Sequence, residues 1–216
     1  NYGKYELIIA NNILENIDDI NSWISNIKNL LSEDGYFIFE SSYLLDMVKN
    51  KVFDFIYHEH LSYISLKPLK EFCKKMNMDI FNAELNDIHG GSLRLFIGRK
   101  DVRGISKNIE TLLDLEEEKG IYKKERLEKF ANDVKQQKKE LNMLLWNLKK
   151  EGKKIVGISA PAKGNALTNY CKISTDLLDY ITEKSPLKIG KFTPGMHIPI
   201  LSDDKLLEDK PDYGLI

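Results

Sequence analysis

The sequence has 216 residues, of which 42% are hydrophobic and 30% are charged, as in globular proteins with one large domain or two smaller ones. Its formal net charge of −1 offers no electrostatic footprint for nucleic acid or an acidic membrane surface, and we expect neither partner. No apolar run approaches the roughly 20 residues of a membrane-spanning helix. The two cysteines, Cys73 and Cys171, lack a metal-ligand spacing, so we expect a cytoplasmic protein with reduced thiols.

The first predicted unit consists of a strand, a helix and a second strand. An apolar run over residues 5–10 is typical of a strand buried in a parallel sheet. Apolar residues with i, i+3, i+4, i+7 spacing predict a helix over residues 20–31, and Asp18 and Asp19 favour its N-terminus. A second strand is expected over residues 36–40. This order predicts a right-handed βαβ unit.

Open α/β sheets bind ligands beyond the carboxyl ends of their strands. That rule places residues 11–16 and 40–43 at the mouth of a site. The alternative for Asn11 and Asn12 is a simple turn after the first strand, since asparagine often forms turns. The residues alone leave both interpretations open.

The chain then continues through a predicted short helix over residues 44–50 and another that begins at Pro68 and runs to about residue 77. Two strands are expected over residues 79–85 and 92–98, and they should form the hairpin edge of the sheet. The double glycine between them either lets the backbone approach a ligand or only makes the turn.

The segment FDFIYHEHLSY, residues 53–63, concentrates polar aromatic and titratable side chains in a protein with only four histidines. It offers an imidazole that titrates near neutral pH, a carboxylate that can orient it, and phenols that can hydrogen-bond an oxygen. The alternative is a structural role, because histidine and tyrosine are often half-buried. His58 and His60 could also bind zinc, but no cysteine or third histidine is near them in the sequence, and no metal site is predicted.

Residues 106–152 are charged and helical in pattern, with an apolar face that includes Leu127, Leu144 and Leu145. We expect a linker helix followed by a long helix. The heptad pattern is too irregular to predict a dimeric coiled coil, and a monomer is expected.

The last part begins with a predicted strand over residues 153–159 that leads into the small-residue loop 160–165. A strand, such a loop and a helix resemble a phosphate cradle. Neither GxxxxGK[ST] nor GxGxxG is present, so the loop alone is a weak indication of anion binding. Another strand is expected over residues 178–182, and the lysines after it either face the same ligand or belong to a solvated turn.

Four segments together carry a resemblance to a known family. They are ANNILENIDD (10–19), FDFIYHEHLSY (53–63), HGGSLR (89–94), and the pair GISAPAKGNALTNY (157–170) with SPLKIGKFTPGMHIPI (185–200). The sequence resembles the S-adenosylmethionine-dependent sugar C-methyltransferases that act on nucleotide-linked 4-keto-deoxysugars. The resemblance spans almost the whole chain, and the YHEHLSY and GK-x-TPG segments are its most specific parts.

The resemblance implies an α/β fold, in which the C-terminal half of a Rossmann-like class I methyltransferase sheet is joined by long helices to a second Rossmann-like α/β domain. Residues 1–105 would be the second half of the methyltransferase domain, 106–152 a helical connector, and 153–216 a C-terminal domain that binds the sugar nucleotide. We therefore expect a fragment. The family's N-terminal zinc module and the glycine-rich half of its methyltransferase domain would lie outside this sequence, and zinc is expected only in that module.

The resemblance also implies roles for nine residues. His60 would be the base that removes the C3 proton of the sugar, with Glu59 beside it and Tyr57 bonded to the enolate oxygen. Asn11 and Asn12 would line the pocket for S-adenosylmethionine. Four residues of the last domain would hold the nucleotide or diphosphate: Ser159, Lys163, Gly164 and Asn165.

One position departs from the family pattern. Relatives commonly have histidine where this sequence has Asn16, and asparagine cannot accept a proton. Two other functions remain as alternatives: an O- or N-methyltransferase for a small molecule on the same scaffold, and a nucleotide-sugar-binding protein without turnover.

Overall fold

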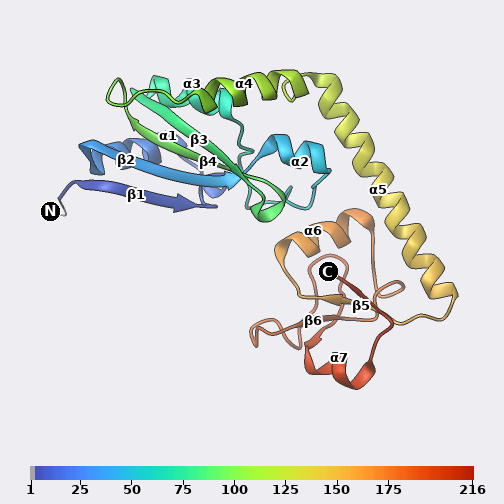
Figure 1. Ribbon diagram of the computed structural model, residues 1–216. Helices are drawn as coiled ribbons and strands as arrows, with labels where there is room; N and C mark the ends of the chain where they lie inside the picture. Colours follow the sequence, from blue (N-terminus) through green and yellow to red (C-terminus); the bar gives the residue numbers. More distant parts are fainter. Residues whose placement is uncertain (1–2) are drawn as a thin grey trace. The chain divides into compact units, whose positions relative to one another are not determined.

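The computed structural model describes residues 3–216, apart from the side chain of His89. The chain divides into two compact units, one formed by residues 1–52 and 58–130, the other by residues 53–57 and 131–216 (Figure 1). Both units are α/β, as predicted. No helix in the described part of the chain is long and apolar enough to cross a membrane.

The first unit is built on a four-stranded sheet with the order β1-β2-β4-β3. The strands are β1 (Tyr5–Asn11), β2 (Leu31–Ser42), β3 (Met78–Asn86) and β4 (Ser92–Arg99). β1 and β2 are parallel, while β4 runs antiparallel between β2 and β3. The predicted βαβ unit and the hairpin edge are confirmed.

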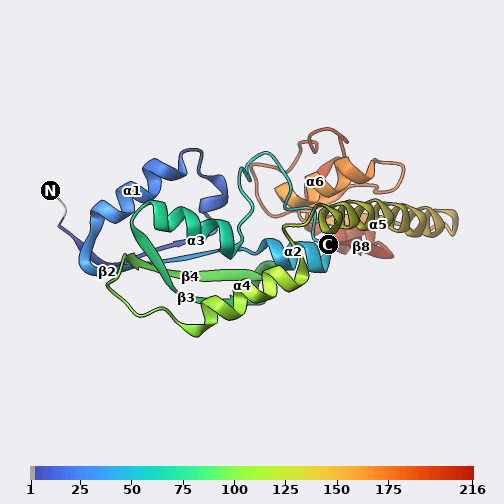
Figure 2. The same ribbon diagram turned by 90° about the horizontal axis from the view of Figure 1, so that it is seen from above.

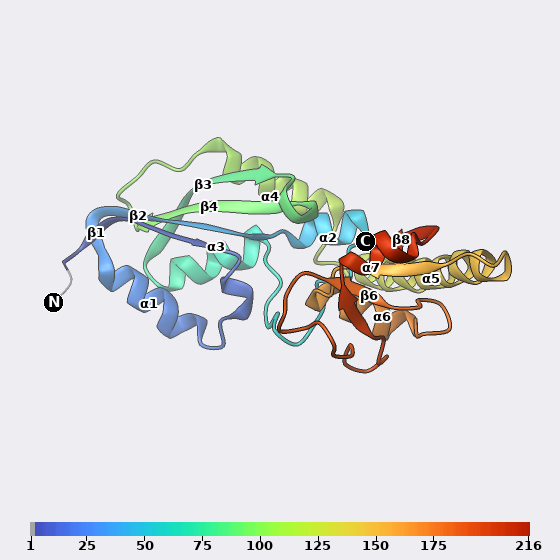
Figure 3. The ribbon, with the colours of Figure 1, turned by 90° about the horizontal axis from the view of Figure 1, so that it is seen from below.

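Helices cover this sheet. They are α1 (Ile20–Leu30), α2 (Leu44–Asn50), α3 (Leu66–Lys75) and α4 (Lys107–Lys119), with short 3-10 turns η1 (Leu14–Asn16) and η2 (Ile88–Gly90). α1 and α3 lie side by side on one face of the sheet, and α4 packs along β3 (Figures 2 and 3). Their apolar sides enclose one core that contains Phe37, Phe39, Leu95 and Ile97.

Both ends of α1 are held by polar groups. Asp19 accepts a hydrogen bond from the Ser22 amide at 3.0 Å, which is N-capping by a favoured residue. At the other end Arg99 donates to the carbonyl groups of Lys28, Leu31 and Ser32. The chain enters β2 directly at Leu31, five residues before the predicted start.

Three sequence predictions in this part need correction. β1 was expected to be buried, but it is the edge strand of the described sheet, and Leu7 and Ile9 are 43% and 58% exposed. α3 begins at Leu66, and Pro68 lies in its first turn, where a missing amide proton is tolerated. Leu127, expected on an apolar face, is exposed.

The second unit is built on a parallel sheet with the order β7-β6-β5-β8. Its strands are short: β5 (Ile155–Ile158), β6 (Ile181–Glu183), β7 (Ile200–Ser202) and β8 (Tyr213–Leu215). Strand β6 starts three residues later than predicted. The helices are α6 (Ala162–Cys171), α7 (Asp204–Asp209) and most of α5 (Lys124–Lys150).

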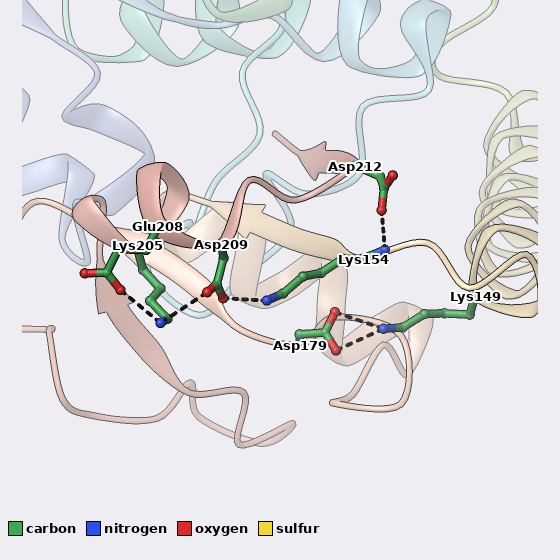
Figure 4. Close-up of polar contacts among 7 residues, drawn as sticks. All are labelled: Lys149, Lys154, Asp179, Lys205, Glu208, Asp209 and Asp212. Carbon is green, nitrogen blue, oxygen red and sulfur yellow. Dashed lines mark hydrogen bonds and ion pairs between the residues drawn. The ribbon is translucent and has the colours of Figure 1, made fainter.

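The core of this unit joins α5, α6 and the sheet through Leu145, Cys171, Leu178, Ile181 and Ile198. Leu144, which was expected on the same apolar face of α5, is instead exposed. The amino end of β5 is held by an ion pair and a hydrogen bond. The Lys154 ammonium group contacts Asp209 at 2.5 Å, and the Lys154 amide donates to Asp212 at 2.8 Å (Figure 4). These contacts fix α7 and the approach to β8 against the start of β5.

Candidate functional site

The carboxyl ends of β1 and β2 lie side by side in the first unit. Asn11 pairs with Glu40 in the parallel register, and the amide of Asn12 donates to the Glu40 carbonyl at 2.7 Å. Asn12 has a φ of 52°, a left-handed conformation that asparagine tolerates better than most residues. Both asparagine residues are exposed. Their side-chain amides lie at the carboxyl edge of parallel strands, which is the place where α/β sheets bind ligands.

The end of β2 is fixed by an ion pair. Arg94, on β4, donates from Nη2 and Nε to Glu40 Oε2 at 2.7 and 2.8 Å. The Glu40 side chain is only 5% exposed, so its charge is compensated where water cannot solvate it. Arg94 also approaches Glu84 at 3.7 Å. The arginine of the HGGSLR segment therefore holds the sheet at the edge where the candidate site lies.

The glycines of the same segment pack against α2. Gly91 has a φ of 124°, and a side chain there would lie 2.4 Å from the Cβ of Asp46. Its carbonyl accepts from the amide of Tyr43, and the Gly90 carbonyl accepts from the Asn50 side chain. Of the two roles left open for the double glycine, the structure shows the turn and its close contact with a helix.

Glu15 is a residue that the sequence analysis missed. It lies in η1, four residues after Asn11, and is only 4% exposed. Its carboxylate accepts a hydrogen bond from the buried hydroxyl of Ser41 at 2.9 Å. Its backbone carbonyl accepts from the amides of Leu61 and Ser62 at 2.7 and 3.2 Å. A single acid between Leu14 and Asn16 follows no period or motif, so only tertiary contacts reveal it.

These last hydrogen bonds bring the YHEH segment to the carboxyl edge of the sheet. His60, which precedes Leu61, is half-buried. His58 and Glu59 are more open, with side chains 86% and 56% exposed and 3.9 Å between His58 Nε2 and Glu59 Oε1. The first unit thus contains the predicted base, Glu59 and both asparagines. In the described part of the chain, no group of three His, Cys, Asp or Glu residues is arranged to hold a metal ion.

A groove of about 370 Å³ follows the same segment in the first unit. Its walls come from η1, the start of α1, residues 62–65 and α3, and they include Leu14, Asp18, Tyr63 and Phe72. Burial raises the pKa of the Tyr63 phenol above its ordinary value. The groove has the size of a small-molecule site and combines apolar walls with a few polar groups.

The remaining predicted site residues belong to the second unit. Tyr57 is the last residue of the segment 53–57, which belongs to the second unit. Ser159 is exposed after β5, with a left-handed φ of 69°. The sequence predicted that Lys163, Gly164 and Asn165 lie in a loop before the helix. In the structure α6 begins at Ala162, so these three residues lie in its first turn.

One amide of the predicted phosphate cradle, that of Ala160, already donates to a carboxylate, which belongs to Glu183. It accepts from the amides of Ala160, Lys184 and Ser185 at 3.3, 2.9 and 3.2 Å. Lys188 Nζ lies 3.0 Å from the same carboxylate and also donates to the Ala160 carbonyl. The hydrogen bond from Lys188 and those from the backbone amides lower the pKa of Glu183 to about 2. These groups join the ends of β5 and β6.

Lys163 has a partner as well. Its ammonium group lies 3.3 Å from the centre of the Phe55 ring, a cation–π contact. Burial lowers the pKa of Lys163, and the charge of Asp54 partly opposes that effect. Phe53 packs on Tyr170 at the other end of α6, with 5.1 Å between ring centres. The contacts of Lys163 in this structure are with the segment 53–57.

The TPG turn of the GKFTPGMHIPI segment is held by α6. The Asn169 side chain donates to the carbonyl groups of Pro194 and Asn165, each at 2.9 Å. Gly195 has a φ of 83°, and a side chain there would lie 1.9 Å from Asn169 Oδ1. The glycine is therefore required by both the backbone conformation and the close contact.

Comparison with known proteins agrees with the sequence analysis. Residues 87–216 match the family model described as C-methyltransferase C-terminal domain, and residues 1–82 match a methyltransferase domain model. The first match covers more than half of the chain, and the chain belongs to this C-methyltransferase family. The resemblance inferred from the four segments is confirmed.

One curated relative is C-methyltransferase NovU of Streptomyces niveus, which is 29% identical over all 216 residues. The chain spans about half of that relative, 51% of its length. Among solved structures, the magnesium protoporphyrin IX methyltransferase ChlM from Synechocystis PCC 6803, with bound SAH, is 15% identical. That match has a TM-score of 0.35 and covers 45% of this chain and 46% of the other.

Proposed function

We propose that the complete protein is an S-adenosylmethionine-dependent C-methyltransferase that methylates C3 of a nucleotide-linked 4-keto-deoxysugar. The observation that carries this proposal is the 2.7 Å hydrogen bond from the Leu61 amide to the Glu15 carbonyl. It ties the residue after His60 to the turn that follows Asn11 and Asn12. The candidate base and the candidate cofactor residues are thereby held at one edge of one sheet, which supports proton removal next to a bound cofactor.

His60 would begin the reaction by taking the proton from C3, which the C4 ketone acidifies. The electron pair left behind forms an enolate, and His60 becomes an imidazolium. Glu59, the adjacent carboxylate, would stabilise that cation or orient the substrate. Tyr57 would donate a hydrogen bond to the enolate oxygen. General-base catalysis typically supplies roughly 10²–10⁴-fold in rate, so correct positioning must supply much of the remainder.

Asn11 and Asn12 would hold the cofactor through their exposed amides. S-adenosylmethionine would supply an electrophilic methyl group there. C3 of the enolate would accept this methyl group, and the cofactor would be left as a neutral thioether. No metal ion is required for this balance of charge.

The second unit would bind the nucleotide part of the substrate. Because the amide of Ala160 already donates to Glu183, a diphosphate would be held by the Ser159 hydroxyl and by amides at the start of α6, including that of Gly164. Asn165 would contribute through its side chain, since its amide already donates to the Pro161 carbonyl. Lys163 would contribute its positive charge from beside Phe55. We propose a cytoplasmic monomer whose partner is the nucleotide sugar.

The test is proton exchange at C3. The complete protein is incubated with a nucleotide-linked 4-keto-deoxysugar in deuterated water, first without and then with S-adenosylmethionine. We expect deuterium at C3 and a methylated product, and both should be lost in His60→Asn. His58→Asn, which changes an exposed histidine two positions away, is the matched control and should retain both activities. Exchange that persists in His60→Asn would overturn the mechanism.

The same experiment separates the alternatives. Methyl transfer without exchange at C3 would indicate an O- or N-methyltransferase. Binding of the nucleotide sugar with neither exchange nor transfer would indicate a binding protein.

A further inference from the structure

We propose that Glu15 is a positioning residue for His60. Its buried carboxylate would fix η1 to β2, and η1 would in turn fix the segment that follows the base. This inference rests on the proposed function, because it takes His60 as the base.

The side chain of Glu15 is anchored in the sheet. A buried carboxylate is unfavourable unless hydrogen bonds compensate its charge, and Glu15 is only 4% exposed. Its hydrogen-bond donor, Ser41, is itself almost completely buried and lies near the end of β2, where hydrogen bonds to β4 hold the backbone. The 2.9 Å contact from Ser41 Oγ therefore links η1 to a rigid strand.

The backbone of Glu15 carries the second link. Its carbonyl oxygen accepts two amide hydrogen bonds, from Leu61 and Ser62. These amides belong to the two residues after His60, so the position of the carbonyl sets where that part of the loop lies. Ile64 continues the attachment by pairing with Tyr43, and the Leu44 amide donates to the Ile64 carbonyl at 2.8 Å.

The two links make a chain of contacts from β2 through Ser41, Glu15 and Leu61 to His60. Loss of the carboxylate would leave η1 held mainly by Leu14, whose side chain is in the core. The turn could then shift by a fraction of an ångström and carry the loop with it. A misplacement of about 1 Å can cost an enzyme roughly 10²-fold in rate, which makes small displacements of a base measurable.

The test uses four variants of the complete protein: Glu15→Ala, Ser41→Ala, the double variant, and Glu15→Gln. The first readout is the rate of deuterium exchange at C3 without S-adenosylmethionine, and the second is the Kd of that cofactor. We expect Glu15→Ala and Ser41→Ala each to slow exchange by about 10- to 100-fold while the cofactor Kd changes by less than about 2-fold. The double variant should be no slower than the slower single variant, because the two substitutions break the same hydrogen bond between Ser41 and Glu15.

Glu15→Gln provides the rescue. Its side-chain carbonyl still accepts a hydrogen bond from Ser41, and we expect exchange within about 3-fold of the original protein. Glu33→Ala, which removes an exposed acidic residue of the same unit, is the matched control and should leave exchange unchanged.

The outcomes distinguish the two proposals. If the unsubstituted protein shows no exchange at C3, the proposed function fails. If it exchanges and His60→Asn does not, but Glu15→Ala and Ser41→Ala exchange at the original rate, only the role of Glu15 fails. Should Glu15→Ala not fold, Ser41→Ala and Glu15→Gln decide: a slow first variant and a fast second support the role, and equal rates overturn it.

Discussion

Glu116 accepts a hydrogen bond from Tyr43, 73 positions earlier in the sequence, with 2.9 Å between Tyr43 Oη and Glu116 Oε1. The same carboxylate accepts from the amides of Leu66 and Lys67 at 2.6 and 3.0 Å, and from the phenol of Tyr122 at 2.5 Å. Burial, followed by the nearby charge of Glu116, raises the pKa of Tyr43, so this phenol stays protonated and keeps donating. One buried acid thus joins the end of β2, the start of α3 and the end of α4.

Replacement of that acid should destabilise the first unit. In Glu116→Gln the side chain loses its charge. One carboxylate oxygen is replaced by an NH₂ group, which is itself a donor and cannot accept the hydrogen bonds that the oxygen accepted. We expect the free energy of unfolding to fall by about 2–4 kcal/mol, because hydrogen bonds to a charged group are lost and buried amides lose their partner. Urea denaturation followed by circular dichroism measures the loss. Glu117→Gln, at the neighbouring glutamate whose exposed side chain pairs with Lys67, should change stability by less than about 0.5 kcal/mol.

Arg94→Ala should also destabilise the first unit, because it leaves the buried Glu40 carboxylate without a counter-ion. We expect a loss of about 2–3 kcal/mol, somewhat below the usual cost of breaking a buried pair, since Arg94 itself is 39% exposed. The double variant with Glu40→Gln should recover part of that loss. Glu84→Gln removes only the longer, more exposed contact and serves as the control. Equal losses in Arg94→Ala and Glu84→Gln would contradict this account.

Two glycines of the second unit separate backbone strain from steric contact. Gly190 and Gly195 have φ values of 80° and 83°, but a side chain at Gly190 meets nothing within 4 Å, whereas one at Gly195 meets the Asn169 amide. We expect Gly190→Ala to cost about 1 kcal/mol for the left-handed backbone. Gly195→Ala should cost clearly more, because Asn169 must move and give up its bond to Pro194. Thermal unfolding of both variants compares the two costs, and similar melting temperatures would disprove the steric contribution.

Acid should weaken the contact between β5 and β6 through Glu183. Its pKa falls from 4.5 to about 2 in the folded protein, so the folded state binds this proton less readily than the unfolded state. The stabilisation is complete above about pH 4.5 and is lost as the pH decreases towards 2. We expect Glu183→Gln to be less stable than the original protein at pH 7, with a difference that shrinks between pH 5 and 2. A difference in unfolding midpoint that is constant with pH would rule out this linkage.

The regular elements could be predicted because local patterns determine them. The apolar spacing of α1, the Asp19 cap, the bounds of α2 and the hairpin strands all follow from propensity and period. The sequence predicted a hairpin at the edge of the sheet, but it did not predict that β4 would lie between β2 and β3. Burial was less predictable: an apolar strand such as β1 reads the same whether it is central or at an edge, because only its neighbours decide.

The contacts of three buried acids could not be predicted. Glu15, Glu116 and Glu183 each accept a hydrogen bond from a residue more than 20 positions away, and a single glutamate has no local signature of that role. The loop after β5 shows what spacing leaves out. Its small residues predict a phosphate cradle, but spacing cannot show that one of its amides, that of Ala160, already donates to Glu183.

The position of β4 also affects how the first unit can be synthesised. β2 cannot complete its pairing until the ribosome has released residues 92–99, about fifty positions later than the end of β2. During that interval the nascent chain presents one unpaired edge of a long strand with an apolar centre, the kind of surface that pairs wrongly with other chains. We expect a chaperone that shields extended segments to increase the yield of this protein during expression.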